Sequence, residues 1–392
     1  MQISKERIRP AYVGDTAVSR GTVISVAIYM HDLSPGGVER QCLVLARELA
    51  ARGINIVLVV HQLRGELMPL LPSNLRVVSL NGSRTLDDVI RLRRFLRQEK
   101  PDVLLANVDH NNIAATIAKA ISGTRTKVVI CQHNPLSAHF TDTENWKHRL
   151  VPWFYGRMAR WVDHAIGVSD GIGAELVSVG IPKAKVTRIY NAVIGADFDC
   201  RAGQAVTHPW LTEKDRPVFV SAARLVGMKD QRTLLRAFAS VVRKRPARLM
   251  MLGTGPMLPE LRELADLLGI AEHVTFEGFV RNPLPYMQAA DAFLLSSRCE
   301  GFGNVLVEAL GCGTPVISTD CPYGPAEILE KGRFGVLVPP RDPEAMATAM
   351  IDCLDHPERW SAGMLRDRAN AFSYAVCADQ YAGMLRALVA KG

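Results

Sequence analysis

The sequence predicts an α/β protein made of two Rossmann-like domains that face each other across a cleft. Short runs rich in β-branched residues alternate with longer amphipathic segments, a pattern typical of βα units around a parallel sheet. This alternation lapses after residue 191 and restarts at 218. The chain has 392 residues, more than one hydrophobic core usually serves. We therefore expect two domains of similar size.

Composition restricts the class of protein. Hydrophobic residues make up 48% and charged residues 22%, which is typical of soluble globular proteins and excludes a disordered, collagen-like or coiled-coil chain. The longest apolar runs, such as 54–60, are far shorter than the roughly 20 residues of a membrane-spanning helix. The net charge of +8 suits an anionic ligand, a phospholipid surface or nucleic acid, or is solubilising surface charge.

The cysteines and the first residues indicate a cellular compartment. None of the eight cysteines forms a C-x-x-C pair, so the spacing predicts neither a zinc site nor a compact disulfide framework. Residues 1–21 lack both periodicity and the apolar core of a signal peptide, and we interpret them as a loose extension. We expect a cytoplasmic protein with reduced thiols.

The first domain is expected over residues 22–200. Gly53 and Pro101 stand where two of its helices should end. The predicted strands are 23–30, 54–60, 75–80, 102–107, 127–132, 164–168 and 186–191; the predicted helices are 37–52, 86–100, 111–121, 143–161 and 171–179.

A linker without clear period is expected around 192–217, with its centre at 201–216, and the second domain over 217–373. We expect the terminal helix, within 374–392, to pack back on the first domain. The predicted strands of the second domain are 218–223, 248–253, 274–279, 292–296, 315–318 and 335–338; the predicted helices are 231–244, 258–268, 283–290, 304–310, 343–354 and 374–389.

The most informative segment is 296–310, because it follows an apolar strand and opens a helix. Gly301 and Gly303 allow a tight turn and a close approach of a ligand to the backbone. A helix that begins near Asn304 directs free N–H groups and a positive dipole end toward the cleft, which favours an anion. Glu300 and Glu308 flank this helix start and can accept hydrogen bonds from hydroxyls. The layout suits a nucleotide sugar, although a solvated glutamate at an ordinary helix start fits the spacing as well.

The same segment resembles the E-x7-E motif of the family-4 glycosyltransferases, which have the GT-B architecture. The segments 313–320 and 324–329 continue that resemblance, which covers most of 216–345. It implies that Glu308 binds the donor's ribose and that Glu300 binds the donor sugar. It further implies that backbone amides after Glu300 approach the sugar and diphosphate; these belong to Gly301, Phe302, Gly303, Asn304 and Val305.

Arg224 and Lys229 follow the first strand of the second domain, at the edge that faces the cleft. A guanidinium and an ammonium together can neutralise a diphosphate leaving group, although two surface cations are often only solvated. The segment resembles the arginine and lysine loop by which these transferases bind the diphosphate, with Ala222 and Ala223 where a glycine is common. Gly253 and the pair Phe279 and Val280 fall in segments that resemble the nucleotide side of the site.

In the first domain, Gly36, Gly37 and Glu39 lie at a strand-to-helix turn, which could hold a phosphate or simply form the turn. They resemble the G-G-x-E loop that touches donor phosphate or acceptor, although Glu39 could equally serve the helix dipole. His133 follows another strand, where the family often has a histidine near the reacting sugar, but a structural role is as plausible. His110 is a weaker candidate of the same kind.

Two further segments indicate other kinds of partner. Asp197 and Asp199 form a D-x-D pattern that binds metal in a different transferase fold, but here it follows a segment that resembles the GT-B hinge, so we expect no metal. Residues 146–161 mix basic and aromatic side chains. Exposed, they would suit an anionic lipid surface, and nucleic acid less well because no nucleic-acid fold signature accompanies them; alternatively, the aromatics pack inward.

The resemblance implies a retaining, metal-independent glycosyltransferase without a cofactor. Its expected partners are a nucleotide-sugar donor, most simply a UDP-linked hexose or N-acetylhexosamine, and a lipid-linked or surface-glycan acceptor such as lipopolysaccharide. We expect peripheral contact with the cytoplasmic face of an inner membrane and no nucleic-acid partner. A nucleotide-sugar epimerase of the same fold and a non-catalytic nucleotide-sugar-binding protein remain alternatives.

Overall fold

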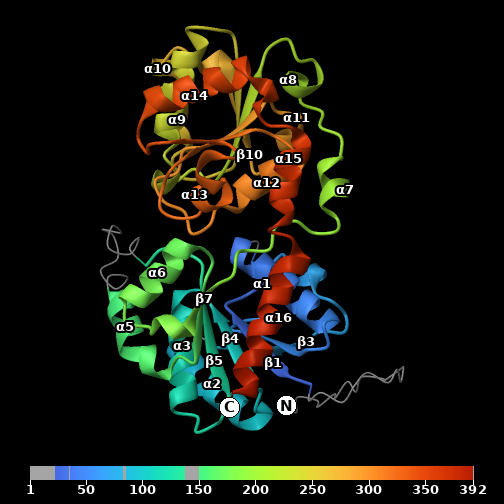
Figure 1. Cartoon of the computed structure of the whole chain (residues 1–392), viewed down its shortest axis with the longest axis vertical. Coiled ribbons are helices and arrows are strands. Elements are labelled where there is room, and N and C mark those ends of the chain that lie inside the picture. Colours follow the sequence, from blue (N-terminus) through green and yellow to red (C-terminus); the bar gives the residue numbers. More distant parts are fainter. Residues whose placement is uncertain (1–22, 35, 83–84, 137–149, 392) are drawn as a thin grey trace, which may run out of the picture.

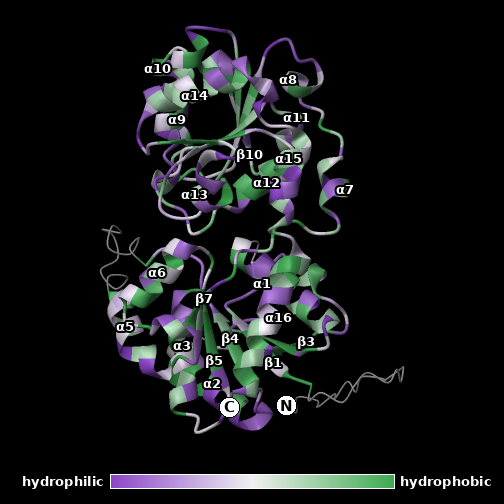
Figure 2. Cartoon of the chain, in the orientation of Figure 1, coloured by the Kyte–Doolittle hydropathy of each residue, from purple (hydrophilic) through white to green (hydrophobic). Residues whose placement is uncertain are grey.

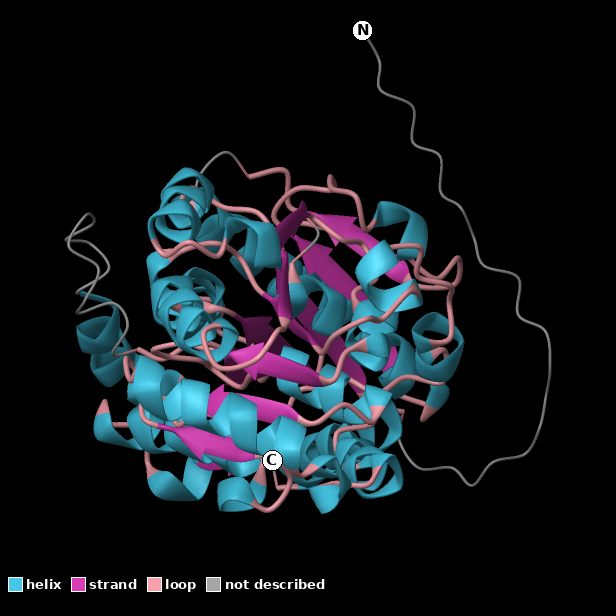
Figure 3. Cartoon of the chain, turned by 90° about the horizontal axis from the view of Figure 1, so that it is seen from above, coloured by secondary structure: helices cyan, strands magenta, loops and turns pink. Residues whose placement is uncertain are grey.

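The computed structural model describes residues 23–34, 36–82, 85–136 and 150–391, and it contains two α/β domains. The domains are stacked along the long axis of the molecule, with the first domain at the bottom of Figure 1 and the second at the top. Seen from above, helices surround the strands of the sheets (Figure 3). The predicted α/β class with two Rossmann-like domains is confirmed.

The first sheet has seven parallel strands in the order β3-β2-β1-β4-β5-β6-β7. The order changes direction between β1 and β4, which makes this point of the carboxyl edge the place where an open α/β sheet binds ligands. The strands are β1 (Ser25–Met30), β2 (Asn55–Val60), β3 (Arg76–Ser79), β4 (Val103–Asn107), β5 (Lys127–Gln132), β6 (His164–Gly167) and β7 (Val186–Arg188).

Helices cover both faces of this sheet because each presents one apolar side to it. Helix α1 buries Cys42, Leu43, Ala46 and Leu49, at the spacing of one helix face. The helices of this domain are α1 (Gly37–Ala51), α2 (Thr85–Glu99), α3 (Asp109–Ala120), α5 (Val151–Met158) and α6 (Asp170–Ser178).

The second sheet has six parallel strands in the order β10-β9-β8-β11-β12-β13. Its strands are β8 (Val218–Ala222), β9 (Arg248–Leu252), β10 (Val274–Gly278), β11 (Ala292–Leu295), β12 (Val316–Thr319) and β13 (Val336–Val338). It is accompanied by α9 (Gln231–Val242), α10 (Leu258–Leu267), α11 (Leu284–Ala289), α12 (Asn304–Cys312), α13 (Pro325–Ile328), α14 (Pro343–Asp355) and α15 (Ala362–Asn370). The strands of both sheets are predominantly hydrophobic (Figure 2), as expected for parallel strands covered on both faces.

Several described elements differ from the predicted ones, among them the four-residue helix α13, which was not predicted. The predicted helix 143–161 is described only from residue 150, as α5 followed by a short 3-10 helix, Ala159–Trp161; its first part lies outside the described residues. The expected linker contains two short helices, α7 (Phe198–Ala202) and α8 (Pro209–Thr212). Helix α15 was not predicted, because Leu365 and Ala369 are its only fully buried side chains and its apolar pattern is weak.

The last helix, α16 (Tyr374–Ala390), leaves the second domain and runs alongside α1 of the first (Figure 1). Arg52, at the end of α1, holds it through three contacts. Its Nε donates to Asp379 at 2.7 Å and its Nη2 to the carbonyl of Ala375, while its own carbonyl accepts from Arg386. The chain therefore crosses between the domains twice, once after β7 and once before α16. Among the described helices, none is long and apolar enough to cross a membrane.

Candidate functional site

An ion pair between a half-buried lysine and a buried glutamate lies at the carboxyl edge of the second sheet. Nζ of Lys229 and Oε1 of Glu300 are 2.5 Å apart, and Glu300 is only 9% exposed. The hydroxyl of Ser297 donates to the same carboxylate oxygen at 2.6 Å. The sequence analysis proposed Lys229 and Glu300 as site residues from two separate motifs. In the structure these two residues join the loops after β8 and β11.

Backbone contacts fix the loop that carries Glu300. The amide of Arg298 donates to the carbonyl of Met228 at 2.9 Å, beside Lys229. On the other side, the amide of Glu300 donates to Pro322 and its carbonyl accepts from Tyr323, both at 2.8 Å. The loops after β8, β11 and β12 thus form one layer, and Glu300 lies at its centre.

Helix α12 begins directly after this layer, and its first amides are free to bind an anion. Its N-cap is Gly303, whose φ of 101° favours glycine and whose position carries no side-chain cap. Because the first N–H groups of a helix have no intrahelical partner, those of Asn304 and Val305 remain available. The helix start therefore supplies donors and a positive dipole end beside the Lys229–Glu300 pair.

Two further cations lie on the loops after β8 and β11. Arg224 is exposed, and its carbonyl accepts from Nε2 of the buried Gln231 at 2.9 Å. Arg298 is also exposed, and its guanidinium lies over Gly227 in the Lys229 loop. Arg298 was not predicted as a site residue. Its position two residues before Glu300 could have indicated it.

Glu308 lies half-buried one turn further along α12. Burial raises the pKa of its carboxyl to about 7, an effect that the positive charges of Arg201 and Arg40 partly offset. Within the described residues, no hydrogen bond to this carboxylate is present. Glu308 is therefore available to a ligand, and it is only partly ionised at neutral pH.

The loops after β9 and β10 complete the second domain's side of the site. Gly253 has a φ of 139°, and a Cβ atom there would overlap the carbonyl oxygen of Ala223. Its amide donates to the carbonyl of Gly278 at 2.7 Å. The next residue, Phe279, is 69% exposed, an unusual exposure for a phenylalanine, while Val280 packs partly against the core. Phe279 offers a flat apolar surface to a planar ligand group.

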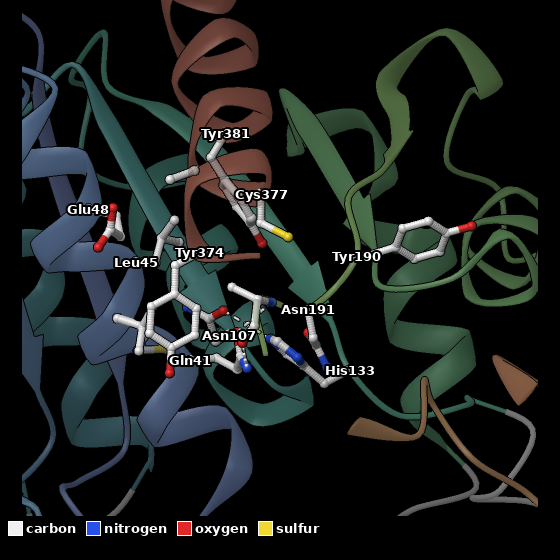
Figure 4. Close-up of a pocket in the computed structure, with 14 residues that line it drawn as sticks. Gln41, Leu45, Glu48, Asn107, His133, Tyr190, Asn191, Tyr374, Cys377 and Tyr381 are labelled. Carbon is white, nitrogen blue, oxygen red and sulfur yellow. Dashed lines mark hydrogen bonds between the residues drawn. The ribbon is translucent and has the colours of Figure 1, made fainter. Parts of the chain in front are cut away.

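His133 lies on the first domain's side, after β5. It is buried, and its Nε2 is 3.1 Å from Oδ1 of Asn107 (Figure 4). Burial lowers its pKa to about 4, so the imidazole is neutral at pH 7. Its backbone carbonyl meets Gly301, where a Cβ atom would overlap it. The structure therefore brings the His133 and Glu300 loops together across the domain interface.

The turn at Gly36 and Gly37 forms the start of α1, with Gly36 as N-cap. The carboxylate of Glu39 folds back over Gly36, where it would overlap a Cβ atom. Burial and the nearby Asp32 raise the pKa of Glu39, while its own amide lowers it. The carboxylate of Glu39 therefore lies at the start of α1, where the sequence analysis considered a phosphate.

Direct contacts close the interface between the domains. The carboxylate of Glu327 accepts from the amide of Asp170 at 2.9 Å, at the start of α6. The hydroxyl of Tyr323 donates to Glu175 at 3.1 Å. Phe302, expected only to offer its amide, stacks on Tyr190 with ring centroids 5.2 Å apart. Sequence patterns had indicated none of these pairings, because each joins residues more than 100 positions apart.

His110 and the D-x-D segment have other surroundings. His110 packs edge-to-face against His31, with ring centroids 5.3 Å apart, at the carboxyl edge of the first sheet. Asp197 is the N-cap of α7 and lies 3.9 Å from Arg201. In the part of the chain that is described, no group of three or more histidine, cysteine, aspartate or glutamate side chains has the geometry of a metal site.

Two family models match the chain, one on each domain. The model "Glycosyltransferase Family 4" matches residues 35–194, and the model "Glycosyl transferases group 1" matches residues 216–356. Together they cover most of the chain and leave the segment 195–215, with α7 and α8, between them.

Two curated relatives show how far the similarity extends. The lipopolysaccharide core biosynthesis glycosyltransferase LpsE of Rhizobium meliloti is 26% identical over 82% of this chain and 86% of its own. The GDP-mannose-dependent alpha-(1-6)-phosphatidylinositol monomannoside mannosyltransferase of Mycolicibacterium smegmatis is 39% identical. That match spans 38% of this chain and 41% of the relative, so it represents part of the relative's length.

A solved structure shares the fold. HepE of Anabaena in complex with UDP superposes with a TM-score of 0.75 over 93% of this chain and all of its own, at 20% identity. At this identity the likeness concerns the fold, which is the GT-B arrangement of two Rossmann-like domains.

We expect the Glu308 carboxyl to titrate near pH 7. Between its ordinary pKa of 4.5 and about 7, the folded chain keeps a proton that the unfolded chain has lost. The contribution of Glu308 to the free energy of unfolding therefore falls as pH rises through this window. Denaturant unfolding of the wild type and of Glu308→Gln, from about pH 5 to about pH 8, should show the variant gaining relative stability. A constant difference across this range would contradict the raised pKa.

Proposed function

Since the chain belongs to the group 1 and family 4 glycosyltransferases, we propose that it transfers a hexose or N-acetylhexosamine from a UDP-linked donor to a hydroxyl of a lipid-linked or surface-glycan acceptor such as lipopolysaccharide. The observation that carries this proposal is the uncapped start of α12 beside the Lys229–Glu300 ion pair, whose carboxylate is buried. An anionic group bound there would meet free amides and cations on one side and a carboxylate on the other.

In this mechanism the second domain stabilises the departing diphosphate. Lys229, Arg224 and Arg298 supply positive charge, and the amides of Asn304 and Val305 donate hydrogen bonds. These groups are held before the reaction begins, so they stabilise developing negative charge without a large reorganisation. Because the protein's own cations can play this part, we propose that transfer needs no metal. Activity that persists in a chelator would support this, and loss of activity would oppose it.

The carboxylates orient the donor. Glu300 accepts hydrogen bonds from the sugar hydroxyls while Lys229 and Ser297 hold its carboxylate in place. Glu308 accepts from the ribose, and it does so more strongly when ionised. Phe279 stacks against the base. In this proposal Glu300 meets the sugar, Glu308 the ribose and Phe279 the base, all at the carboxyl edge of the second sheet.

We propose that the anomeric configuration is retained. In such a transfer the sugar–phosphate bond breaks, the acceptor oxygen bonds to the anomeric carbon from the same face, and a leaving phosphate oxygen takes the acceptor proton. No protein base is required for this balance. His133 suits this scheme, because a neutral buried imidazole can hold a hydrogen bond near the sugar without carrying the proton away.

The nature of the acceptor is proposed from the relatives and from one surface. LpsE is named for lipopolysaccharide core biosynthesis. On α5 and the turn after it, Trp153 is 54% exposed and Trp161 36% exposed, and each has an arginine over its ring, Arg157 and Arg160. Exposed aromatics with adjacent cations suit the interface of an anionic bilayer. We propose peripheral contact with the cytoplasmic membrane face through this segment.

A nucleotide panel tests the donor. We expect thermal unfolding with a chelator present to shift upward with UDP-sugars and not with GDP-, ADP- or dTDP-sugars. A ligand that binds only the folded state adds about 2.7 kcal/mol at 100 times its Kd. A shift with GDP-sugars alone, the donor class of the mycobacterial relative, would overturn the UDP assignment. Conversion of a UDP-sugar without acceptor would instead identify an epimerase.

Two substitutions should separate turnover from donor binding. Lys229→Ala should lower kcat by about 100-fold or more, because the charge acts on the leaving group. Glu308→Ala should raise the donor KM by about tenfold with a smaller change in kcat, because the ribose is bound alike in the ground and transition states. Steady-state kinetics checks both, with Lys214→Ala and Glu260→Ala as controls, since these residues form surface ion pairs elsewhere. Unchanged kinetics in both site variants would remove the basis of the proposed site.

Vesicle flotation tests the membrane surface. The wild type should float with vesicles that contain anionic phosphatidylglycerol more than with phosphatidylcholine alone. Trp153→Ala should reduce this binding, because it removes apolar area and a partner of Arg157. Leu267→Ala is the matched control, since Leu267 is 77% exposed on the second domain. Equal flotation with both vesicles, or equal loss in the control, would contradict the proposed contact.

A further inference from the structure

Where the chain first crosses between the domains, hydrogen-bonding groups from three elements meet. Gln41 comes from α1, Asn191 and Ala192 from the crossing segment after β7, and Asn304 from the start of α12. Figure 4 shows Gln41 and Asn191 close to His133 and Asn107, on the side of the pocket away from α16. These residues lie in both domains and in the connection between them.

Gln41 holds the crossing segment by both ends of its amide. Its Oε1 accepts from the backbone amide of Ala192 at 3.0 Å, and its Nε2 donates to the carbonyl of the same residue. Both backbone groups of Ala192 are therefore bonded, as they would be to a neighbouring strand in a sheet. Hinge residues absorb changes in φ and ψ when domains move, so a residue with both backbone groups bonded is a poor place for such a change.

Asn191 continues the connection into the second domain. Its Nδ2 donates to Oδ1 of Asn304 at 3.0 Å, and Asn304 is the first residue of α12. The start of the helix that would bind the diphosphate is therefore tied, through two side chains, to α1 of the first domain. Close to these contacts, the side chain of His133 bonds to that of Asn107 within the first domain. This bond holds the residue whose backbone carbonyl lies against Gly301.

A second set of contacts holds the interface between α6 and the loop after β12. There the carboxylate of Glu327 accepts from the amide of Asp170, and the hydroxyl of Tyr323 donates to Glu175. Glu327 is half-buried, as are Gln41 and Asn191, and leaving buried polar groups unpaired is costly. What distinguishes Gln41 and Asn191 is that their bonds reach the crossing segment and the first residue of α12.

We propose that Gln41 and Asn191 are positioning residues that set the separation between the α12 start and the first domain. The proposal rests on the function proposed above, because it assigns them to the approach of donor to acceptor. We assign neither residue a contact with donor, acceptor or reacting atoms. They act through Ala192 and Asn304, and a displacement of about 1 Å between reacting groups is enough to slow a reaction by about 100-fold.

The test compares Gln41→Met and Asn191→Ala with the wild type. Gln41→Met keeps the length of the side chain and removes both bonds to Ala192. Each variant should lower kcat by about tenfold or more while the Kd of UDP stays within about twofold, because most of the groups proposed to bind the nucleotide lie in the second domain. Hydrogen exchange of the segment 190–194 and of the first turn of α12 should accelerate in both variants.

Gln62→Met is the matched control, since Nε2 of Gln62 donates to the carbonyl of Gly82 within the first domain. It should alter neither exchange at the crossing nor the kinetics. Unchanged exchange at residues 190–194 and α12 in both variants would overturn the proposal, as would a loss of UDP affinity equal to the loss of kcat. If the wild type transfers no sugar, the proposed function fails, while the exchange measurement still decides whether Gln41 and Asn191 hold the interface.

Discussion

The ion pair between Lys229 and Glu300 is the contact on which the rest of the site depends. It joins loops from two strands of one sheet, and the backbone of Glu300 joins a third through Pro322 and Tyr323. A buried charge that loses its partner is strongly destabilising, so the two side chains are held together whether or not a ligand is present. The start of α12 follows Glu300 directly along the chain, so these three bonded loops determine its position. Donor binding would therefore use a cation and a carboxylate that are already fixed.

Close backbone approach explains why glycines stand where the domains meet. At Gly301 a side chain would overlap the carbonyl of His133, and at Gly324 it would overlap the carbonyl of Phe302. The first contact is between domains and the second within the loop layer of the second domain. Both allow the α12 start to lie against the first domain with Phe302 stacked on Tyr190. The same glycines that form the turn thus also determine how closely the two halves can approach.

Burial shapes the charges of the site in two directions. It raises the pKa of Glu308 and lowers that of His133, so that one carboxyl is partly protonated and one imidazole is neutral near pH 7. The exposed Arg224 and Arg298 lie on the loops that carry Lys229 and Glu300. The site thus concentrates positive charge where a diphosphate would lie and keeps the neighbouring wall of the first domain uncharged at His133.

The sequence by itself determined the α/β class, the two domains and the glycosyltransferase family. These follow from local periodicity and from motifs such as 300–308, whose residues are neighbours along the chain, and the fold and the family matches confirm them. It also nominated both members of the Lys229–Glu300 pair, because each follows a strand at the same sheet edge. The short helices of the linker, α13 and α15 were not predicted, since few of their side chains are buried and their patterns are short or weak.

Only the tertiary structure decided which of these residues touch and in what state. The contacts of Gln41 with Ala192 and of Asn191 with Asn304 join positions more than 100 residues apart, and no local pattern encodes such a pairing. The folding back of Glu39 over Gly36, the stacking of Phe302 on Tyr190 and the raised pKa of Glu308 likewise depend on surroundings that form only when the chain has folded. Local periodicity and motifs are properties of neighbouring residues, whereas distances, burial and charge states are properties of the assembled interface.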